Sequence, residues 1–128
     1  MKPDTSFWQS MADVLISNPV SIDRPKGSSH PRYPQVIYPL DHGFLENTTS
    51  SDGGGIDVWI GSLNSGANKQ GAKTLTGILC TFDTLKRAAE IKLLIGCTKE
   101  DILVIRDFHK EMPTHYLRNP MVEYDLSN

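Results

Sequence analysis

The chain has 128 residues, of which 38% are hydrophobic and 22% are charged, and its formal net charge is -2. This composition predicts one folded domain, residues 1–128, that is large enough to bury its own core. Its 13 basic and 15 acidic residues argue against the strongly basic surface that nucleic-acid-binding proteins use.

The N-terminal stretch predicts a helix over residues 6–17. Ser6 can cap its start, Asn18 and Pro19 end it, and apolar residues recur at helical spacing at Phe7, Trp8, Met11, Val14 and Leu15. The same stretch lacks the unbroken apolar segment of a signal peptide, and no later segment is long and apolar enough to span a membrane. We therefore expect a cytoplasmic protein without a membrane partner.

Residues 19–39 contain five prolines, which exclude a long helix and predict short strands at 20–23 and 36–38 joined by rigid turns. Further strands are predicted at 56–60 and 74–82, on either side of a polar Gly/Ser/Asn loop at 61–73. Residues 85–97 fit either a helix or a strand, and we favour the strand. Thr98 and Asp101 resemble a capping box, which predicts a helix over residues 98–110.

The two cysteines, Cys80 and Cys97, form neither a CxxC motif nor a Cys/His ligand spacing. They predict two ordinary buried thiols, as in a cytosolic protein, and neither a zinc site nor a disulfide framework.

The stretch "SDGGGIDVWI", residues 51–60, places two aspartates around three glycines just before an apolar run. Asp-Gly pairs form turns, because glycine takes positive φ without steric cost and aspartate accepts from its own neighbouring backbone. The stretch therefore has two interpretations, a turn that leads into a strand or a site that uses both carboxylates.

Seven pieces of the sequence, in order, resemble the motifs of a soluble family I inorganic pyrophosphatase in a shortened form. They are "IDRP", "RY", "YPLDHGFLENT", "DGGGIDV", "GILCTFD", "EIKL" and "FHKE", and they span residues 21–110. The collinear order carries the resemblance, since each piece alone would be weak. It implies an α+β fold with a small antiparallel, OB-like β-barrel and flanking helices.

The resemblance implies a Mg²⁺ site, with Mn²⁺ as the alternative metal. Hydrolysis of a phosphoanhydride needs metal ions that neutralise phosphate oxygens and acidify a water, and Mg²⁺ is held by a few carboxylates plus waters. The residues implied as metal ligands are Asp52, Asp57, Asp83, Glu90 and Asp23. Asp83 could instead begin the turn "DTLK", Glu90 could lie on a solvated strand face, and Asp23 could be an ordinary surface charge.

The resemblance also implies a set of residues that bind the phosphate groups of a phosphorylated small molecule. They are Arg32, Tyr38, Lys92, His109 and Lys110. The cations among them would supply charge-assisted hydrogen bonds. Related pyrophosphatases form symmetric oligomers, so the resemblance implies a homo-oligomer as well.

The sequence departs from the family at the position of the water-activating base. The family's middle loop aspartate is Gly54 here, and the chain between Tyr33 and Ile37 is shorter than the family's hairpin. A general base contributes typically about 10² to 10⁴ in rate, so its loss should slow hydrolysis unless His42 takes its place. Two functions remain open: a divergent metal-dependent phosphoanhydride hydrolase, or a catalytically degenerate barrel that binds a phosphorylated ligand or a protein partner.

Overall fold

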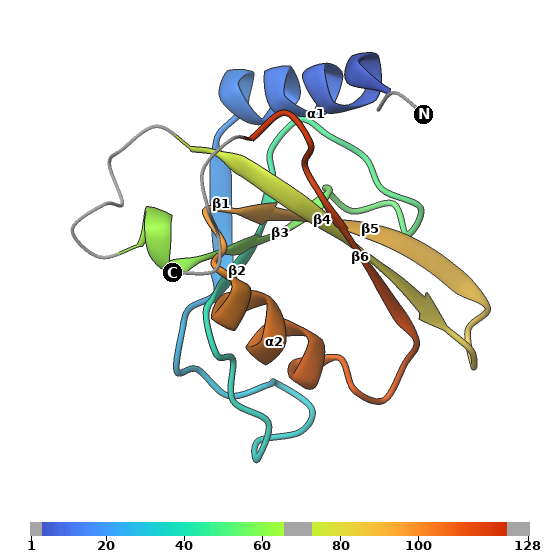
Figure 1. Cartoon of the computed structure of the whole chain (residues 1–128). Coiled ribbons are helices and arrows are strands. Elements are labelled where there is room, and N and C mark those ends of the chain that lie inside the picture. Colours follow the sequence, from blue (N-terminus) through green and yellow to red (C-terminus); the bar gives the residue numbers. More distant parts are fainter. Residues whose placement is uncertain (1–3, 66–72, 123–128) are drawn as a thin grey trace.

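The protein is an α+β domain in which a six-stranded mixed sheet lies between two helices (Figure 1). The computed structural model describes residues 4–65 and 73–122. The helices are α1 (Thr5–Ser17) and α2 (Lys99–Phe108), with a short 3-10 helix, η1, at Ser62–Asn64. The strands are β1 (Val20–Arg24), β2 (Asp41–Leu45), β3 (Asp57–Ile60), β4 (Leu75–Asp83), β5 (Ala88–Ile95) and β6 (Thr114–Arg118).

The sheet is open and mixed, so the predicted antiparallel, OB-like barrel is not confirmed. The strand order is β1-β2-β3-β5-β4-β6, which leaves β1 and β6 at the two ends. All neighbours pair antiparallel except β3 and β5, which run parallel from Val58↔Leu93 to Ile60↔Ile95. The purely antiparallel prediction is therefore wrong. A parallel pair needs a long crossover connection, and β4 with its preceding loop supplies it here.

Both helix predictions are confirmed, with one correction at a cap. Asp4, not Ser6, caps α1 by accepting from the backbone N–H groups of Ser6 and Phe7. The capping box of α2 is present, because Thr98 accepts from the backbone of Asp101 and Asp101 accepts from the backbone of Thr98. In the parts of the chain that the structure describes, neither α-helix is long and apolar enough to cross a membrane.

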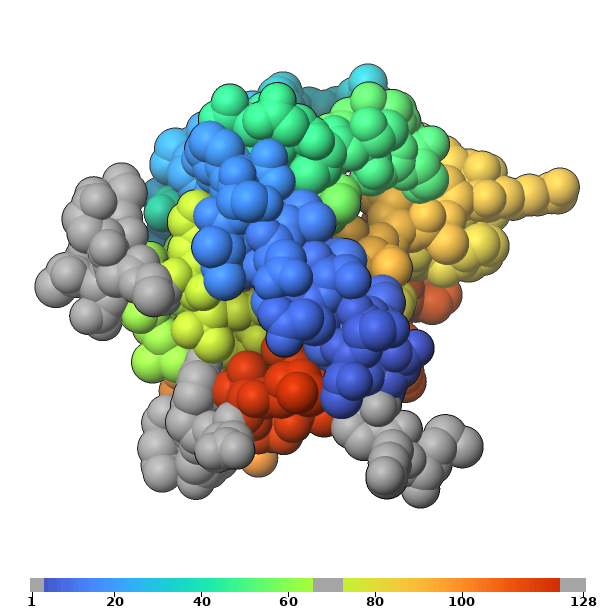
Figure 2. Space-filling model, turned by 90° about the horizontal axis from the view of Figure 1, so that it is seen from above, coloured from blue at the N-terminus to red at the C-terminus, as the bar shows by residue number. Residues whose placement is uncertain are grey.

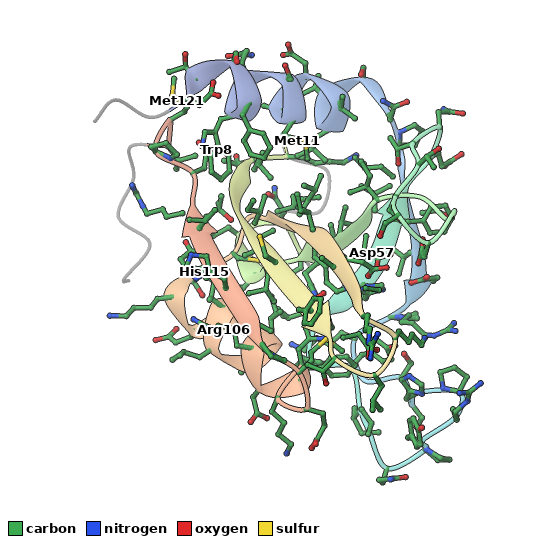
Figure 3. All side chains as sticks on the ribbon, turned by 90° about the vertical axis from the view of Figure 1, so that its right-hand side faces the viewer. Trp8, Met11, Asp57, Arg106, His115 and Met121 are labelled. Carbon is green, nitrogen blue, oxygen red and sulfur yellow. The ribbon has the colours of Figure 1, made fainter. Side chains whose placement is uncertain are left out.

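The central strands are buried on both faces, which explains their continuous apolar runs. On one face, Val58, Ile78 and Leu93 pack with α1, which crosses the molecule in Figure 2 and directs Trp8 and Met11 toward the sheet in Figure 3. On the opposite face, Trp59, Leu79 and Leu94 pack with α2 through Ile102 and Ile105. The two clusters alternate along the strands as the period-two geometry of a β-strand requires.

The structure confirms four of the predicted strands and corrects the rest. Residues 20–23, 56–60, 74–82 and the ambiguous stretch 85–97 correspond to β1, β3, β4 and β5. The strand predicted at 36–38 is wrong, since only an isolated bridge, Ser29↔Ile37, forms there. Sequence reasoning did not identify β2 or β6, and residues 66–72 of the predicted polar loop lie outside the described residues.

Candidate functional site

Five residues that the sequence analysis selected line a single pocket of about 250 Å³. They are Asp52, Asp83, Glu90, Lys92 and His109. They come from the glycine loop, the β4–β5 hairpin and the end of α2, so the fold brings together segments that are far apart in sequence. The remaining wall is formed by Thr81, Lys86, Ala88 and Met112, and we refer to the whole as the carboxylate–lysine pocket.

Lys92 is the best-anchored charge at this pocket. Its side chain is only 9% exposed, and its Nζ lies 2.8 Å from Asp57 Oδ2 and 3.5 Å from Glu90 Oε2. A buried ammonium group needs such partners, because leaving it unpaired would carry a large desolvation penalty. The register of β4 and β5 places Glu90 opposite Thr81 and Lys92 opposite Leu79, so both charges lie on the α2 face of the sheet.

Asp57 belongs to this charge cluster but does not line the pocket. It begins β3, and its carboxylate is occupied by Lys92. The resemblance implied that Asp57 and Asp52 hold the same metal ion, whereas in this structure the Asp57 carboxylate contacts the ammonium group of Lys92.

The glycine loop holds Asp52 in a turn. Asp52 Oδ1 accepts from the Ser50 hydroxyl at 2.6 Å and from the Gly54 N–H at 2.9 Å. The Ser50 hydrogen bond is the main cause that holds the pKa of this carboxyl below its usual range, with further lowering by Gly54 and by the neighbouring Glu90 side chain. The turn interpretation is therefore correct for Asp52, and the same carboxylate also lines the pocket.

Two of the three glycines in this loop stand where a side chain would be strained, and the third does not. Gly53 has φ of +88°, which favours glycine, and a Cβ at Gly55 would lie 2.7 Å from the Leu45 carbonyl oxygen. Gly54 has neither constraint, because its Cβ would meet only Asp52 Oδ1 at an ordinary 3.4 Å. The backbone therefore accepts a side chain at position 54, where the pyrophosphatase pattern has its aspartate.

Asp83 also serves a turn while it lines the pocket. Its Oδ1 accepts from the N–H groups of Leu85 at 3.0 Å and Lys86 at 2.9 Å, which closes the β4–β5 hairpin. This is the turn alternative that the sequence left open for "DTLK". The same turn brings the Lys86 side chain to the pocket, a residue that sequence reasoning missed.

His109 contributes an uncharged ring to the pocket wall. Its Nε2 accepts from Trp59 Nε1–H at 3.3 Å, which assigns the proton of the neutral ring to Nδ1 because an indole N–H only donates. Burial, followed by the charge of Lys92, lowers the pKa of His109 to about 3. His109 therefore stays neutral near pH 7 and adds no positive charge for an anion.

The other selected residues do not line this pocket. His42 Nδ1 lies 3.0 Å from Asp23 Oδ1, and the His42 ring packs against Trp59, so these two residues form a separate pair. Tyr38 is buried beside Phe108, with ring centroids 4.7 Å apart, and burial raises the pKa of its phenol. Arg32 and Lys110 are exposed. Arg32 lines a wider cavity of about 870 Å³ that shares Asp83, Lys86 and Met112 with the carboxylate–lysine pocket.

No protein-family model matches this chain, and no curated protein matches it either. The likeness to a pyrophosphatase therefore rests on the quoted motifs.

The carboxylates at the pocket would suit a Mg²⁺ ion that binds together with a phosphate ligand, but they do not form a complete metal site by themselves. Among residues 4–65 and 73–122, no group of three or more His, Cys, Asp or Glu side chains is arranged to hold a metal ion. Mg²⁺, however, is usually bound through one or two carboxylates together with waters and substrate phosphates. Asp52 and Glu90 are neighbouring carboxylates on this wall, and they supply the hard oxygen donors that such an ion prefers.

Proposed function

We propose that this chain binds a phosphorylated small molecule, as its Mg²⁺ complex, in the carboxylate–lysine pocket. One observation carries the proposal: five residues selected by a motif order, and distant in sequence, line one cavity. At about 250 Å³ the cavity suits a compact ligand such as pyrophosphate better than a drug-sized molecule, because pockets for the latter begin at roughly 300 Å³.

Charge favours the metal complex over the bare anion. Asp52, Asp83 and Glu90 give the pocket three carboxylates, while Lys86 and Lys92 give it two ammonium groups. An anionic phosphate entering a wall with excess negative charge is repelled unless a cation accompanies it. In the complex, Asp52 and Glu90 would hold the metal, and Lys86 and Lys92 would donate charge-assisted hydrogen bonds to phosphate oxygens.

Hydrolysis of a phosphoanhydride is the second candidate, favoured by the position of the carboxylates beside the phosphate-binding lysines. Bound Mg²⁺ would supply charge neutralisation and acidify a water. Neither His42 nor His109 is well placed to act as the general base. His42 is paired with Asp23 and lies outside the pocket wall, and His109 Nε2 already accepts a hydrogen bond from Trp59 Nε1–H. We therefore expect binding to exceed turnover.

The test combines binding and hydrolysis in one set of variants. Pyrophosphate is titrated by calorimetry with and without Mg²⁺, and phosphate release is measured with pyrophosphate, nucleoside triphosphates and polyphosphate. We expect binding only with Mg²⁺, and a loss of about tenfold or more in affinity for Lys92→Gln. Lys110→Gln is the matched control, because Lys110 is exposed and does not line the pocket.

Position 54 separates binding from catalysis. Gly54→Asp restores the aspartate of the family pattern at a site where a Cβ has room, and Gly54→Asn is the isosteric control without a charge. Hydrolysis gained by Gly54→Asp alone would mean a metal scaffold that lacks its base. Pyrophosphate that binds neither variant nor the natural protein, with Mg²⁺ or Mn²⁺, would refute the proposed function.

The finer features of the resemblance extend the same proposal. The open sheet would be a reduced form of the pyrophosphatase barrel, and the chain would form a homo-oligomer as related enzymes do. Light scattering of the purified protein tests the oligomer, and a mass equal to one chain of 14.2 kDa would reject it.

A further inference from the structure

The carboxylate–lysine pocket adjoins a larger cavity of about 870 Å³, which we call the wide cavity. The two share three lining residues, Asp83, Lys86 and Met112. The rest of the wide cavity is lined by Leu85 in the β4–β5 turn and by residues 30–33 of the Pro-rich segment. A ligand held in the carboxylate–lysine pocket therefore has room to continue into the wide cavity.

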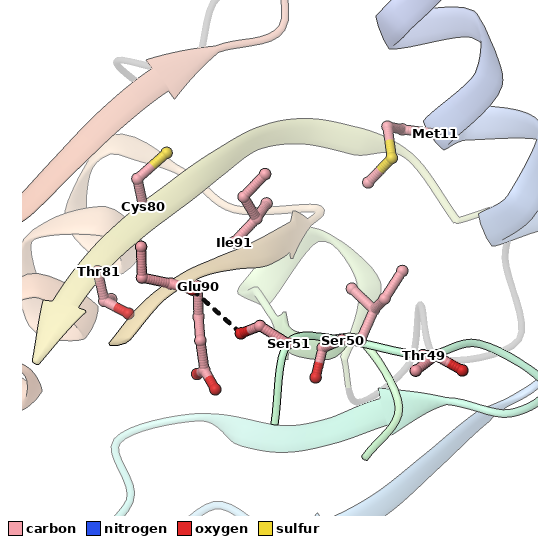
Figure 4. Close-up of a pocket in the computed structure, with 10 residues that line it drawn as sticks. Met11, Thr49, Ser50, Ser51, Cys80, Thr81, Glu90 and Ile91 are labelled. Atoms are coloured by element: carbon pink, nitrogen blue, oxygen red, sulfur yellow. Dashed lines mark hydrogen bonds between the residues drawn. The ribbon is translucent and has the colours of Figure 1, made fainter. Parts of the chain in front are cut away.

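The strand residues at this border lie on the α2 face of the sheet. Side chains alternate along β4, so Thr81 and Asp83 share the face on which Leu79 packs with α2. Figure 4 shows Thr81 and Glu90 directed away from the side on which Met11 of α1 lies.

The Pro-rich segment reaches the same face of the sheet. The His30 ring stacks on the ring of Tyr38, with centroids 6.2 Å apart, and Tyr38 belongs to the buried cluster that packs with α2. Both cavities therefore open on one side of the sheet, and the three shared residues lie between them.

The Pro-rich segment presents an ordered aromatic wall to the wide cavity. His30 Nδ1 accepts from the backbone N–H groups of Arg32 at 3.1 Å and Tyr33 at 3.3 Å, and the His30 and Tyr33 ring centroids are 5.2 Å apart. Backbone hydrogen bonds of 2.8 to 2.9 Å close the segment, from Gly27 to Tyr38, Tyr38 to Ser28, His30 to Val36 and Val36 to Tyr33. A wall that is ordered before binding loses little conformational freedom when a ligand arrives.

The lining indicates the chemistry of the part of a ligand that lies in the wide cavity. Tyr33 is 51% exposed, so its ring is accessible, and Arg32 adds a guanidinium group beside it. Aromatic rings and guanidinium planes are the groups on which flat heterocyclic rings stack. Arg32 and Lys86 outnumber the single carboxylate of Asp83, so an anionic ligand is not repelled here. The volume lies in the range of pockets that hold small organic molecules.

We propose that the ligand is a diphosphate ester with a flat aromatic body, the chemistry of a nucleoside diphosphate. Its diphosphate would bind as the Mg²⁺ complex in the carboxylate–lysine pocket, and its ring would lie against Tyr33 and Arg32 in the wide cavity. Lys86 lines both cavities, so its ammonium group can reach the phosphate that carries the organic body. This inference rests on the proposed function and adds the class of ligand.

The experiment compares three ligands by calorimetry in the presence of Mg²⁺: pyrophosphate, methyl diphosphate and adenosine diphosphate. Methyl diphosphate has the ester group without a ring. We expect adenosine diphosphate to bind about tenfold more tightly than methyl diphosphate, as stacking of one base on an aromatic side chain provides. Equal affinities of these two ligands, or no binding of adenosine diphosphate, would overturn the inference.

Variants of the aromatic wall locate the ring. Tyr33→Ala should bring adenosine diphosphate to the affinity of methyl diphosphate and leave pyrophosphate affinity unchanged, whereas Tyr33→Phe keeps the ring and should keep the tenfold difference. Ile37→Ala is the matched control, because Ile37 is 50% exposed in the same segment and lines neither cavity. A tenfold difference that survives Tyr33→Ala would reject the assigned position of the ring.

Lys92→Gln tests whether the ligand spans both cavities. This variant should weaken all three ligands by the same factor, because the diphosphate is common to them. Adenosine diphosphate affinity that depends on Tyr33 but not on Lys92 would place the diphosphate outside the carboxylate–lysine pocket and refute the spanning arrangement. Pyrophosphate binding alone decides the proposed function, so pyrophosphate that binds while adenosine diphosphate gains nothing from its ring leaves that function intact and rejects only this inference.

A measurement on the natural protein guards against a variant that fails to fold. Adenosine diphosphate should shift the ring resonances of Tyr33, and Mg²⁺-pyrophosphate should leave them in place. Tyr33 resonances that stay in place when adenosine diphosphate binds would refute the inference.

Discussion

Removal of the Lys92 ammonium tests the charge cluster on which the candidate site is built. Lys92→Met keeps the aliphatic stem but leaves the carboxylates of Asp57 and Glu90, which are 26% and 22% exposed, without their cation. Breaking a buried pair by removing one partner costs about 3 to 5 kcal/mol, and the partial exposure of both carboxylates favours the lower end. We expect the free energy of unfolding to fall by about 3 kcal/mol, which lowers Tm by roughly 10 °C.

Urea unfolding of a double-mutant cycle measures how much of this loss belongs to the Lys92–Asp57 pair. Asp57→Asn in the Lys92→Met background removes the charge left unpaired, so the double variant should recover part of the loss, with a coupling energy of about 2 kcal/mol. Ile91→Met in the same strand is a control for packing alone, since Ile91 is 40% exposed. A coupling energy under about 0.5 kcal/mol would show that Asp57 does not hold the Lys92 ammonium, and the reasoning would fail.

Three further predictions concern single residues. His109 has a folded pKa of about 3, below its unfolded value of 6.5, so its contribution to stability is complete above pH 6.5 and declines as the pH falls toward 3. His109→Gln should flatten this acid dependence in urea unfolding, and an NMR titration in which His109 protonates near pH 6.5 would contradict it. Asp101→Ala should lower the free energy of unfolding by about 2 kcal/mol, because the Asp101 carboxylate accepts from the N–H and hydroxyl of Ser62 and from the Thr98 N–H. A thermal unfolding curve equal to that of the natural protein would refute this role. Gly61→Ala should lower the free energy of unfolding by about 2 kcal/mol, since the new Cβ would collide with the Gly96 carbonyl oxygen. Gly54→Ala is the control and should change stability little. Equal chemical-denaturation midpoints for the two variants would disprove the clash.

Local sequence signals were sufficient where an element is specified by its own residues. The apolar spacing after Ser6 and the capping box at Thr98 predicted α1 and α2, because helix formation depends on neighbours within a few positions. The local pattern at 85–97 was ambiguous, and we favoured the strand because the resemblance needs Glu90 and Lys92, two residues apart, on one face; the structure places both at one pocket.

Local signals failed where pairing between distant segments decides the structure. β2 contains Asp41, His42 and Gly43, which carry no strong strand preference, and it becomes a strand because β1 and β3 pair with it on both sides. The parallel contact of β3 with β5 depends on the crossover through β4, and no local pattern encodes it.

At the candidate site, too, some features follow from the local sequence and others from the packing of distant segments. The sequence by itself selected a set of charged residues, of which only a part gathers at the pocket. It left Asp52 and Asp83 open between turn and site, and their hydrogen bonds to nearby N–H groups follow from local chain geometry. Only the tertiary structure decided that Lys92 takes Asp57 as its partner, that His42 is paired with Asp23, and that burial keeps His109 neutral. These outcomes depend on distances across the sheet and on access to water, which arise only when separate segments pack together.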